Sequence, residues 1–320
     1  MAWPTRAETW GEHMEAARET YSEVAKAIAR FEPVTFIAKP KNVAEVSLST
    51  GTGVATLSLP HDDSFLYDMG PSFVVDAADN VAGVDWLWNA WGGQYPDHQR
   101  DAAVAEKLLE HLGMRRYLAP LVLEGGAVDG DGEGTLLASE AVLLNPSRNP
   151  NLGRTEVERH LEAFLGARKI IWLGGGLAED PAGGLIDNVA CFVKPGTVLA
   201  LATADLADPN HAALSDNLQR LRSATDATGR SLEVIEIEQP RSCLGDGGRR
   251  LILSYTSLYL ANGAAIVPAF EDPHDSKAYE VLVKVFAGQE VVQVPARELC
   301  YAGAGIRAIT LGQPAGPAAS

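Results

Sequence analysis

Residues 190–237 read ACFVKPGTVLALATADLADPNHAALSDNLQRLRSATDATGRSLEVIEI, and they hold three short apolar runs and one longer amphipathic stretch. The first run surrounds Cys191, the second covers residues 198–201, and the third covers residues 232–237. Residues 212–227 place apolar side chains at the spacing of a helix. Short apolar runs bounded by turn-forming residues predict strands. The stretch therefore predicts a strand, strand, helix, strand unit.

The same alternation extends over the whole chain. Helical stretches recur at residues 14–31, 101–112, 154–165 and 277–285, and strand-like runs recur at residues 34–38, 72–75, 135–137, 170–173, 265–268 and 291–294. Most of these helices lie farther apart than in a simple strand-helix-strand unit of ~30 residues. Five units of about 64 residues account for the 320 residues, and a fixed period favours a radial arrangement around a central channel. With no Pro/Gly/Ser-rich linker, residues 1–320 are expected to form a single α/β domain.

The net charge of the chain limits the kinds of molecule that the protein can bind. The chain has 26 Lys and Arg against 42 Asp and Glu, which gives a formal net charge of -16. Such a surface repels nucleic acid and anionic membranes over most of its area. The expected partner is a small molecule, and a cationic one fits the charge best.

The sequence gives no sign of a metal, a cofactor or an export signal. Cys191, Cys243 and Cys300 have no CxxC or metal-type spacing, which favours reduced thiols in a cytoplasmic protein. The glycines at 174–176 follow an apolar run, but no helix or Lys-Ser/Thr pair follows them, so a plain turn is favoured over a nucleotide site. The first 19 residues lack the apolar run of a signal peptide or membrane span.

Ten short motifs, spread in order along nearly the whole chain, resemble those of the agmatine deiminase family, which also includes bacterial peptidylarginine deiminases. They are MAWPTR (1–6), FEPVT (31–35), DDSFLYDMGPSFV (62–74), WNAWGG (88–93), LEGG (123–126), DGEGTLL (131–137), LLNPSRNPNL (143–152), IDNVACFVKPG (186–196), SYTSLYLANG (254–263) and GAGIRAIT (303–310). The resemblance implies a pentein, an α/β propeller of five pseudo-symmetric ββαβ units with its active site in the central channel. It also implies a possible homo-oligomer.

The resemblance further implies a chemistry for that channel. In the family a Cys thiolate attacks the guanidinium carbon, a His shuttles protons, and carboxylates hold the guanidinium nitrogens. A thiolate is nucleophilic near neutral pH, an imidazole titrates there, and a planar cation with several N–H donors suits paired carboxylates.

Two of the family's catalytic positions carry other residues here. The segment 302–310 places Ala308 where the nucleophilic Cys would stand, and the segment 183–188 places Leu185 where the His would stand. Loss of the nucleophile removes most turnover in such enzymes. We therefore expect the protein not to be a deiminase.

Three carboxylates match the family's acidic groups. Asp68 and Asp187 align with the guanidinium-binding aspartates, and Glu124 aligns with the carboxylate that orients the missing His. A structural alternative is that these carboxylates only accept hydrogen bonds from backbone amides. If Glu124 is buried without a partner, its pKa should rise, and it could then act as a general acid or base. Tyr67 beside Asp68 is a further catalytic candidate.

Other departures surround these positions. Tyr67 stands where the family has Arg, Asp129 where it has His, and Arg307 precedes Ala308. Arg307 could bind a substrate carboxylate or pair with Asp129, and the sequence does not choose between these. Trp88 and Trp91 either pack in the core or face a cationic ligand. We expect Asp68, Asp187, Asp129, Arg307, Trp88, Trp91, Leu185 and Ala308 to contact the substrate.

Three functions follow from this comparison. The first is an enzyme that runs non-covalent acid/base chemistry, such as cyclisation, isomerisation or hydrolysis, on an amine- or guanidine-bearing molecule through Glu124, Asp187, Asp68 and Tyr67. The second is a non-catalytic pentein that binds a small cation or an active homologue. The third is an agmatine deiminase whose thiol has been relocated, with Cys243 or Cys300 entering the channel.

Overall fold

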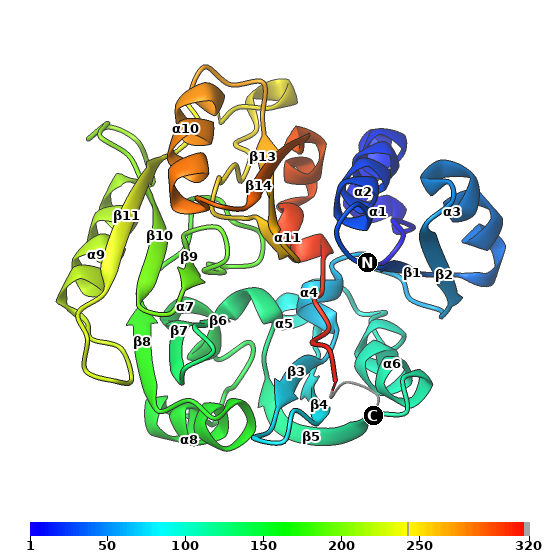
Figure 1. Ribbon diagram of the computed structural model, residues 1–320, viewed down its shortest axis with the longest axis horizontal. Helices are drawn as coiled ribbons and strands as arrows, with labels where there is room; N and C mark the ends of the chain where they lie inside the picture. Colours follow the sequence, from blue (N-terminus) through cyan, green and yellow to red (C-terminus); the bar gives the residue numbers. More distant parts are fainter. Residues whose placement is uncertain (242, 317–320) are drawn as a thin grey trace.

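A computed structural model describes residues 1–241 and 243–316, and the strands of these residues form five small sheets arranged in a ring (Figure 1). The sheets contain β1 (Val34–Ala38) and β2 (Val54–Ser58); β3 (Ser72–Val75), β4 (Val81–Leu87) and β5 (Arg115–Val122); β6 (Val128–Gly130), β7 (Thr135–Ser139) and β8 (Lys169–Leu173); β9 (Ala190–Lys194), β10 (Thr197–Ala202) and β11 (Glu233–Glu238); and β12 (Tyr259–Ala261), β13 (Ala264–Ala269) and β14 (Glu290–Pro295).

The four three-stranded sheets share one pattern of pairing. In each, the middle strand runs antiparallel to the first strand and parallel to the third. A parallel pair needs a crossover connection, and a helix supplies it. This order is the predicted ββαβ unit. The sheet of β1 and β2 keeps only the parallel pair, and Ala2 forms a parallel bridge with Ile37 on its other side.

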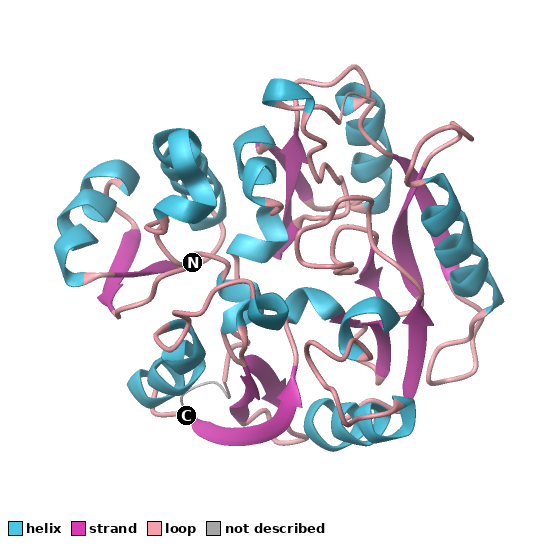
Figure 2. Ribbon diagram, turned by 180° about the vertical axis from the view of Figure 1, so that it is seen from behind, coloured by secondary structure: helices cyan, strands magenta, loops and turns pink. Residues whose placement is uncertain are grey.

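The helices divide by length, and longer ones such as α8, α9 and α10 lie on the outside of the ring in Figure 1 and, seen from behind, in Figure 2. The longer helices are α2 (Met14–Ala29), α3 (Val43–Thr50), α6 (Val104–His111), α8 (Arg154–Leu165), α9 (His211–Ser223) and α10 (Asp275–Val285). The four-residue helices are α1 (Ala7–Trp10), α4 (Leu66–Met69), α5 (Ala90–Gly93), α7 (Glu140–Leu143) and α11 (Ile306–Ile309). In Figure 1, α4, α5 and α11 lie towards the centre of the ring.

The five-unit arrangement predicted from the repeat is confirmed, whereas several element boundaries were wrong. The helix expected at 14–31 ends at Ala29, the one expected at 101–112 begins at Val104, and the one expected at 212–227 ends at Ser223. The strand β5 was missed because its first four residues are exposed and carry no continuous apolar run. Helix α3 was missed because it buries only Val46 and Thr50.

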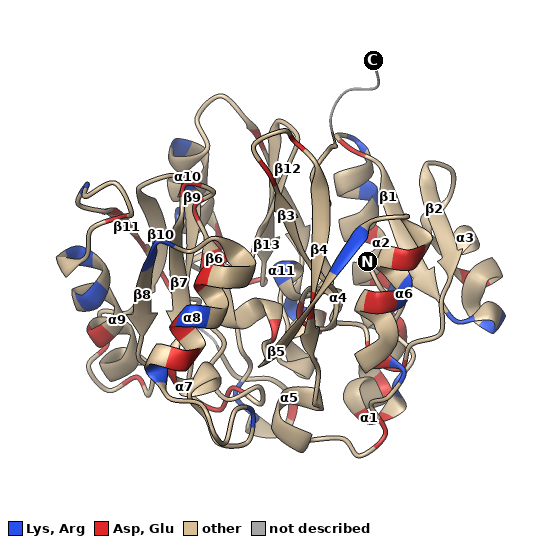
Figure 3. Cartoon of the chain, turned by 90° about the horizontal axis from the view of Figure 1, so that it is seen from below, with Lys and Arg blue, Asp and Glu red and all other residues tan. Residues whose placement is uncertain are grey.

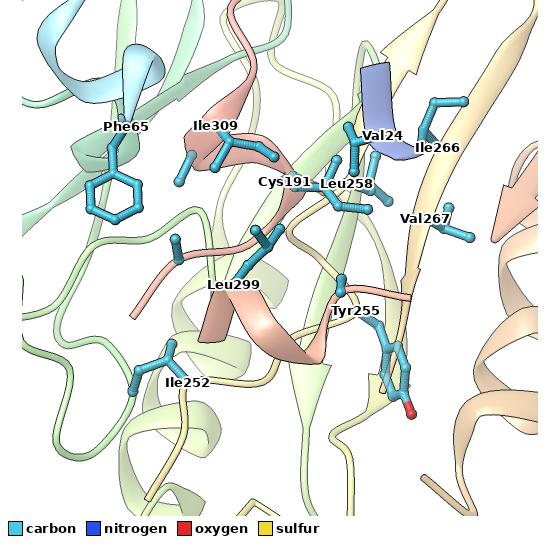
Figure 4. Packing of buried hydrophobic residues seen from close by; sticks show 14 of the residues in the cluster. Val24, Phe65, Cys191, Ile252, Tyr255, Leu258, Ile266, Val267, Leu299 and Ile309 are labelled. Carbon is cyan, nitrogen blue, oxygen red and sulfur yellow. The ribbon is translucent and has the colours of Figure 1, made fainter. Parts of the chain in front are cut away.

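The middle strands of the sheets supply the core. All six residues of β10 and five of the six in β13 are buried, so both strands are covered on both faces and consist of continuous apolar runs. Figure 4 shows part of this core, in which Cys191 lies among apolar side chains that include Leu258 and Ile309. Because these middle strands are packed on both faces, the segments that continue from them towards the centre of the ring start from fixed positions.

The outer surface mixes both signs of charge. In Figure 3, α8 and α9 each carry acidic and basic residues. Within residues 1–241 and 243–316, no helix is long and apolar enough to cross a membrane. The same residues contain no group of three His, Cys, Asp or Glu placed to hold a metal ion.

Candidate active site

An open cavity lies among the inner helices α4, α5 and α11. The wall is formed by Glu8, Thr9, Phe65, Asp68, Trp91, Gln94, Tyr95, Pro181, Ala182, Leu185, Asp187, Asn188, Arg249, Tyr301, Ala302, Gly303, Ala304 and Ala308. These residues come from the N-terminal segment, three inner helices and two long loops, so only the closed ring brings them together.

Two buried aspartates form the floor of the cavity, and we call Asp68 and Asp187 the carboxylate pair. Both converge on Gly126: a Cβ built on this glycine would lie 3.1 Å from the Asp187 Cγ, the Asp68 Oδ1 and a methyl carbon of Leu185. A side chain at Gly126 would therefore crowd the floor. The two aspartates that the sequence predicts to hold a cation both line the cavity, and that role stays a prediction.

The two members of the pair differ in their hydrogen bonds. Asp68 accepts from the Gly126 backbone N–H at 2.8 Å and from the Trp91 indole N–H at 3.0 Å. Asp187 is 1% exposed, and neither of its carboxylate oxygens has a hydrogen-bond partner among the described residues. A buried carboxylate without a partner costs several kcal/mol of stability when it is ionised. Asp187 is therefore placed to receive a cationic ligand.

Burial governs the protonation of the pair. Desolvation raises the pKa of Asp68 to about 7, against an ordinary value of 3.8. Burial, and then the neighbouring Asp68, raise the pKa of Asp187 well above its ordinary value. A ligand with a positive charge would offset both effects, because it favours the ionised carboxylates.

Glu124 is buried behind the cavity wall and is not part of it. Its Oε1 accepts from the Arg148 Nε at 2.9 Å, and Arg148 also donates to the Ala182 carbonyl oxygen at 2.6 Å. Burial raises the pKa of Glu124, while Arg148 opposes that rise. The condition set for Glu124 as a general acid or base, burial without a partner, is not met, since the buried Arg148 holds one of its oxygens; its catalytic role stays a prediction. Arg148 stands in the motif LLNPSRNPNL, but its pairing was not foreseen.

Tyr67, Asp129 and Arg307 form a cluster that does not line the cavity but lies close enough to Asp187 for the Arg307 charge to oppose the rise that burial causes in the pKa of that carboxyl. Arg307 donates to Asp129 Oδ1 and, at 3.2 Å, to the Tyr67 hydroxyl, and its guanidinium carbon lies 5.2 Å from the centre of the Tyr67 ring. Asp129 also accepts from the Phe192 backbone N–H at 2.6 Å. Neighbouring helical residues point about 100° apart, so Ala308 lines the cavity while Arg307 pairs with Asp129. Of the two alternatives for Arg307, the structure contains the pair with Asp129, and substrate contact by these two residues stays a prediction.

The two tryptophans of WNAWGG take different places. Trp91 lies on the wall, and Trp88 packs edge-on against it with ring centroids 4.6 Å apart, without reaching the wall. Trp88 therefore packs behind Trp91, and the ligand contact expected of it stays a prediction. Trp91 has a positive φ of 51°, a conformation that costs about 1–3 kcal/mol in a non-glycine residue and is concentrated at functional sites. Asn89 stabilises the turn by accepting from the Gly92 N–H at 2.9 Å.

Leu185 and Ala308 both line the cavity beside the carboxylate pair, as expected from their places in the motifs. No thiol lies on the wall within the described residues. Cys191, Cys243 and Cys300 are all buried in the structure, and burial raises the pKa of Cys191 to about 12 and raises the pKa values of the other two. None of the three is therefore placed to enter the cavity as a thiolate.

Four wall residues at the open end were missed by the sequence interpretation: Glu8, Tyr95, Arg249 and Tyr301. Glu8 and Tyr95 stand two residues after the motifs MAWPTR and WNAWGG, and Tyr301 stands two residues before GAGIRAIT, so proximity to the motifs was a usable signal for these three. Arg249 lies farther from any motif, and only the tertiary structure places it at the cavity.

Five radial units, four of them with the full ββαβ order, around a cavity with a carboxylate floor define an α/β propeller of the pentein class. The chain belongs to the family of Porphyromonas-type peptidyl-arginine deiminases, whose model matches residues 1–314. Among its relatives, the agmatine deiminase of Stutzerimonas stutzeri is 41% identical over 338 residues, which cover 98% of this chain and 92% of the relative. The agmatine deiminase of Pseudomonas aeruginosa is 40% identical over 343 residues, with the same coverage.

Solved structures agree with this assignment. The agmatine deiminase of Enterococcus faecalis superimposes with a TM-score of 0.93 at 32% identity, covering 97% of this chain and 90% of that one. A C. jejuni agmatine deiminase, in a cysteine-to-serine variant with substrate bound, superimposes with a TM-score of 0.87 at 26% identity, covering 96% and 90% of the two chains.

These comparisons correct the functional expectation. Relatives between 38% and 41% identical over nearly the whole chain are named agmatine deiminases. The expectation of a non-deiminase that runs a non-covalent acid/base reaction was wrong, because it rested on two positions, Leu185 and Ala308, whereas the similarity extends over the entire scaffold.

Proposed function

We propose that the cavity binds a small guanidine cation, with agmatine as the reference ligand, and that deimination is the reaction of this site. The ligand's guanidinium lies on the carboxylate pair, where its N–H groups donate to Asp187 and Asp68. Deimination replaces one guanidinium nitrogen by the oxygen of water, so that a ureido product and ammonium are formed.

One observation carries the proposal: Asp187 is buried, lines the cavity and has no partner for either oxygen among the described residues. A guanidinium offers parallel N–H donors that match a carboxylate in a two-pronged geometry. The names of the relatives point to agmatine as the ligand, since agmatine carries a guanidinium at one end. Trp91 presents an aromatic ring to the same cavity, which favours a cation as well.

A second candidate is binding without turnover. It is favoured by the wall itself, where Leu185 and Ala308 offer neither an acid nor a nucleophile beside the carboxylate pair, and where no described thiol is present. The C. jejuni relative supports the idea that a site of this kind still binds its substrate after the thiol is lost, because its cysteine-to-serine variant is described with substrate bound.

Two measurements on the purified full chain separate these candidates. Isothermal titration calorimetry with agmatine tests the binding proposal, and putrescine, which has amines but no guanidine, is the control ligand. A colorimetric assay for ureido products, run on the same samples, tests deimination. Agmatine binding that is lost in Asp187→Asn supports the site. Equal affinity for agmatine and putrescine would overturn it. Binding with no ureido product over many hours selects the second candidate.

A further inference from the structure

The mouth of the cavity carries two charged side chains of opposite sign, Arg249 and Glu8. Both line the cavity and both are exposed. Within the described part of the chain neither makes an ion pair or a side-chain hydrogen bond. The neighbouring Arg250 behaves differently, because its Nη2 contacts the two carboxylate oxygens of Asp208 at 2.9 and 3.2 Å and it does not reach the wall.

The cavity therefore has a distinct charge at each end. The floor holds only carboxylates, Asp68 and Asp187, whereas the mouth holds one guanidinium and one carboxylate. Between them the wall includes the apolar side chains of Phe65, Trp91 and Leu185. A ligand that matches this order has a cation at one end, a short aliphatic chain, and both an anion and a cation at the other end.

We propose that the site selects a guanidine-bearing α-amino acid, of which L-arginine is the simplest, over the decarboxylated amine agmatine. The inference rests on the proposed function, since it places the ligand's guanidinium on the carboxylate pair. The α-carboxylate then lies on Arg249, and the α-ammonium lies on Glu8. Agmatine fills the same length but leaves Arg249 without a partner and brings a second cation beside it.

The chemistry of the two groups gives the expected size of the preference. An Arg guanidinium binds a carboxylate through two parallel N–H donors, which makes the contact specific. The contact is exposed, so its strength is that of a surface ion pair, about a 2- to 5-fold change in affinity. Repulsion between Arg249 and the agmatine ammonium adds to the difference, because specificity depends on rejecting the wrong ligand as well as binding the right one.

Three ligands and four forms of the full chain test the proposal by calorimetry. The ligands are L-arginine, agmatine, which lacks the carboxylate, and 4-guanidinobutyrate, which lacks the amine. The proteins are the parent, Arg249→Leu, Glu8→Gln and the control Arg159→Leu. Arg159 is exposed on α8 and lies outside the cavity wall, so its loss changes net charge by the same amount as the loss of Arg249. Where product forms, kcat/KM takes the place of Kd.

The expected pattern distinguishes each charge. Arg249→Leu weakens the binding of L-arginine and 4-guanidinobutyrate about 2- to 5-fold and leaves agmatine binding unchanged or tighter. Glu8→Gln weakens the binding of L-arginine and agmatine and leaves the binding of 4-guanidinobutyrate unchanged. Arg159→Leu changes none of them by more than about 2-fold. If the parent binds agmatine as tightly as L-arginine, or if Arg249→Leu weakens all three ligands equally, the inference is wrong while the guanidine site stands. If no guanidine binds the parent, the proposed function falls too.

Discussion

Glu124 and Arg148 form a buried ion pair, in which the Arg148 Nε donates to Glu124 Oε1 at 2.9 Å and the side chains are 0% and 5% exposed. The second Glu124 oxygen has no hydrogen-bond partner among the described residues. Arg148 also binds the carbonyl oxygen of Ala182, a residue of the cavity wall. The pair therefore couples the buried Glu124 to the loop that borders the site.

Removing one member of this pair should destabilise the fold. Arg148→Met leaves the Glu124 carboxylate buried without its cation, and we expect a loss of about 3–5 kcal/mol in the free energy of unfolding. Urea denaturation followed by circular dichroism measures this. Arg154→Met is the matched control, because its pair with Glu140 is 43% and 34% exposed, and such exposed pairs contribute about 1 kcal/mol or less. Equal losses in the two variants would contradict a structural role for the Glu124–Arg148 pair.

Asp187 should show a conflict between function and stability. Asp187→Asn removes a buried charge that has no partner, so the free energy of unfolding near pH 8 should stay the same or rise by about 1 kcal/mol. Guanidine affinity should fall by about 100-fold or more, since a charged hydrogen-bonding partner of the ligand is lost. Denaturation and calorimetry on one preparation measure both quantities.

Asp226→Asn serves as the control for that substitution. Asp226 accepts from the backbone N–H groups of Thr228 and Arg230 and from both of their side chains, and these bonds lower its pKa. Its replacement should reduce stability and leave guanidine binding intact. A large loss of stability in Asp187→Asn would show that Asp187 has a structural partner after all.

Ligand affinity should rise with pH through neutrality. Burial raises the pKa of Asp68 to about 7 in the folded protein, above its ordinary value of 3.8. Guanidinium binding needs the ionised carboxylate. Below pH 7 a proton must therefore leave Asp68 on binding, and Kd should increase by up to about 10-fold for each pH unit. Calorimetry between pH 5.5 and 8.5, in buffers with different ionisation enthalpies, measures both affinity and proton release. An affinity that does not change over this range would contradict the raised pKa.

The free energy of unfolding of the unliganded protein should change with pH in the opposite direction to ligand affinity. Between about pH 4 and 7 the folded state binds more protons than the unfolded state at Asp68, so this group makes the free energy of unfolding fall as pH rises. Asp68→Asn removes that contribution. The comparison of parent and variant across the same pH range isolates it from the other acidic groups, and identical pH profiles would count against the prediction.

The two wall positions that resemble the family's catalytic ones can be tested by restoring those residues. Leu185→His together with Ala308→Cys places an imidazole and a thiol on the cavity wall beside the carboxylate pair. We expect ureido product from agmatine to form at least about 100-fold faster than in the parent, since covalent and acid/base catalysis each contribute large factors. Each single variant should gain far less. A folded double variant that binds agmatine without any gain in rate would contradict the assignment of these positions.

Much of the architecture was predictable because it depends on patterns within short segments. The run at 198–201 and the helix at 154–165 were found from apolar spacing alone. The strand β5 was not, because its exposed residues follow no apolar pattern. The aspartates of the floor were found from their motifs, whereas the partners of Glu124 and Arg307 come from segments that are far apart in the chain.

The sequence by itself determined the repeated ββαβ units, the family, and the presence of Asp68, Asp187, Leu185 and Ala308 at the site. Only the tertiary structure decided which charges face the ligand. Closure of the ring pairs Arg307 with Asp129 and Arg148 with Glu124, and, among the described residues, it leaves Asp187, Glu8 and Arg249 without partners at the cavity. The physical reason is that an ion pair depends on which side chains meet within about 4 Å, and local spacing along the chain does not fix that distance for segments joined only by the closed fold.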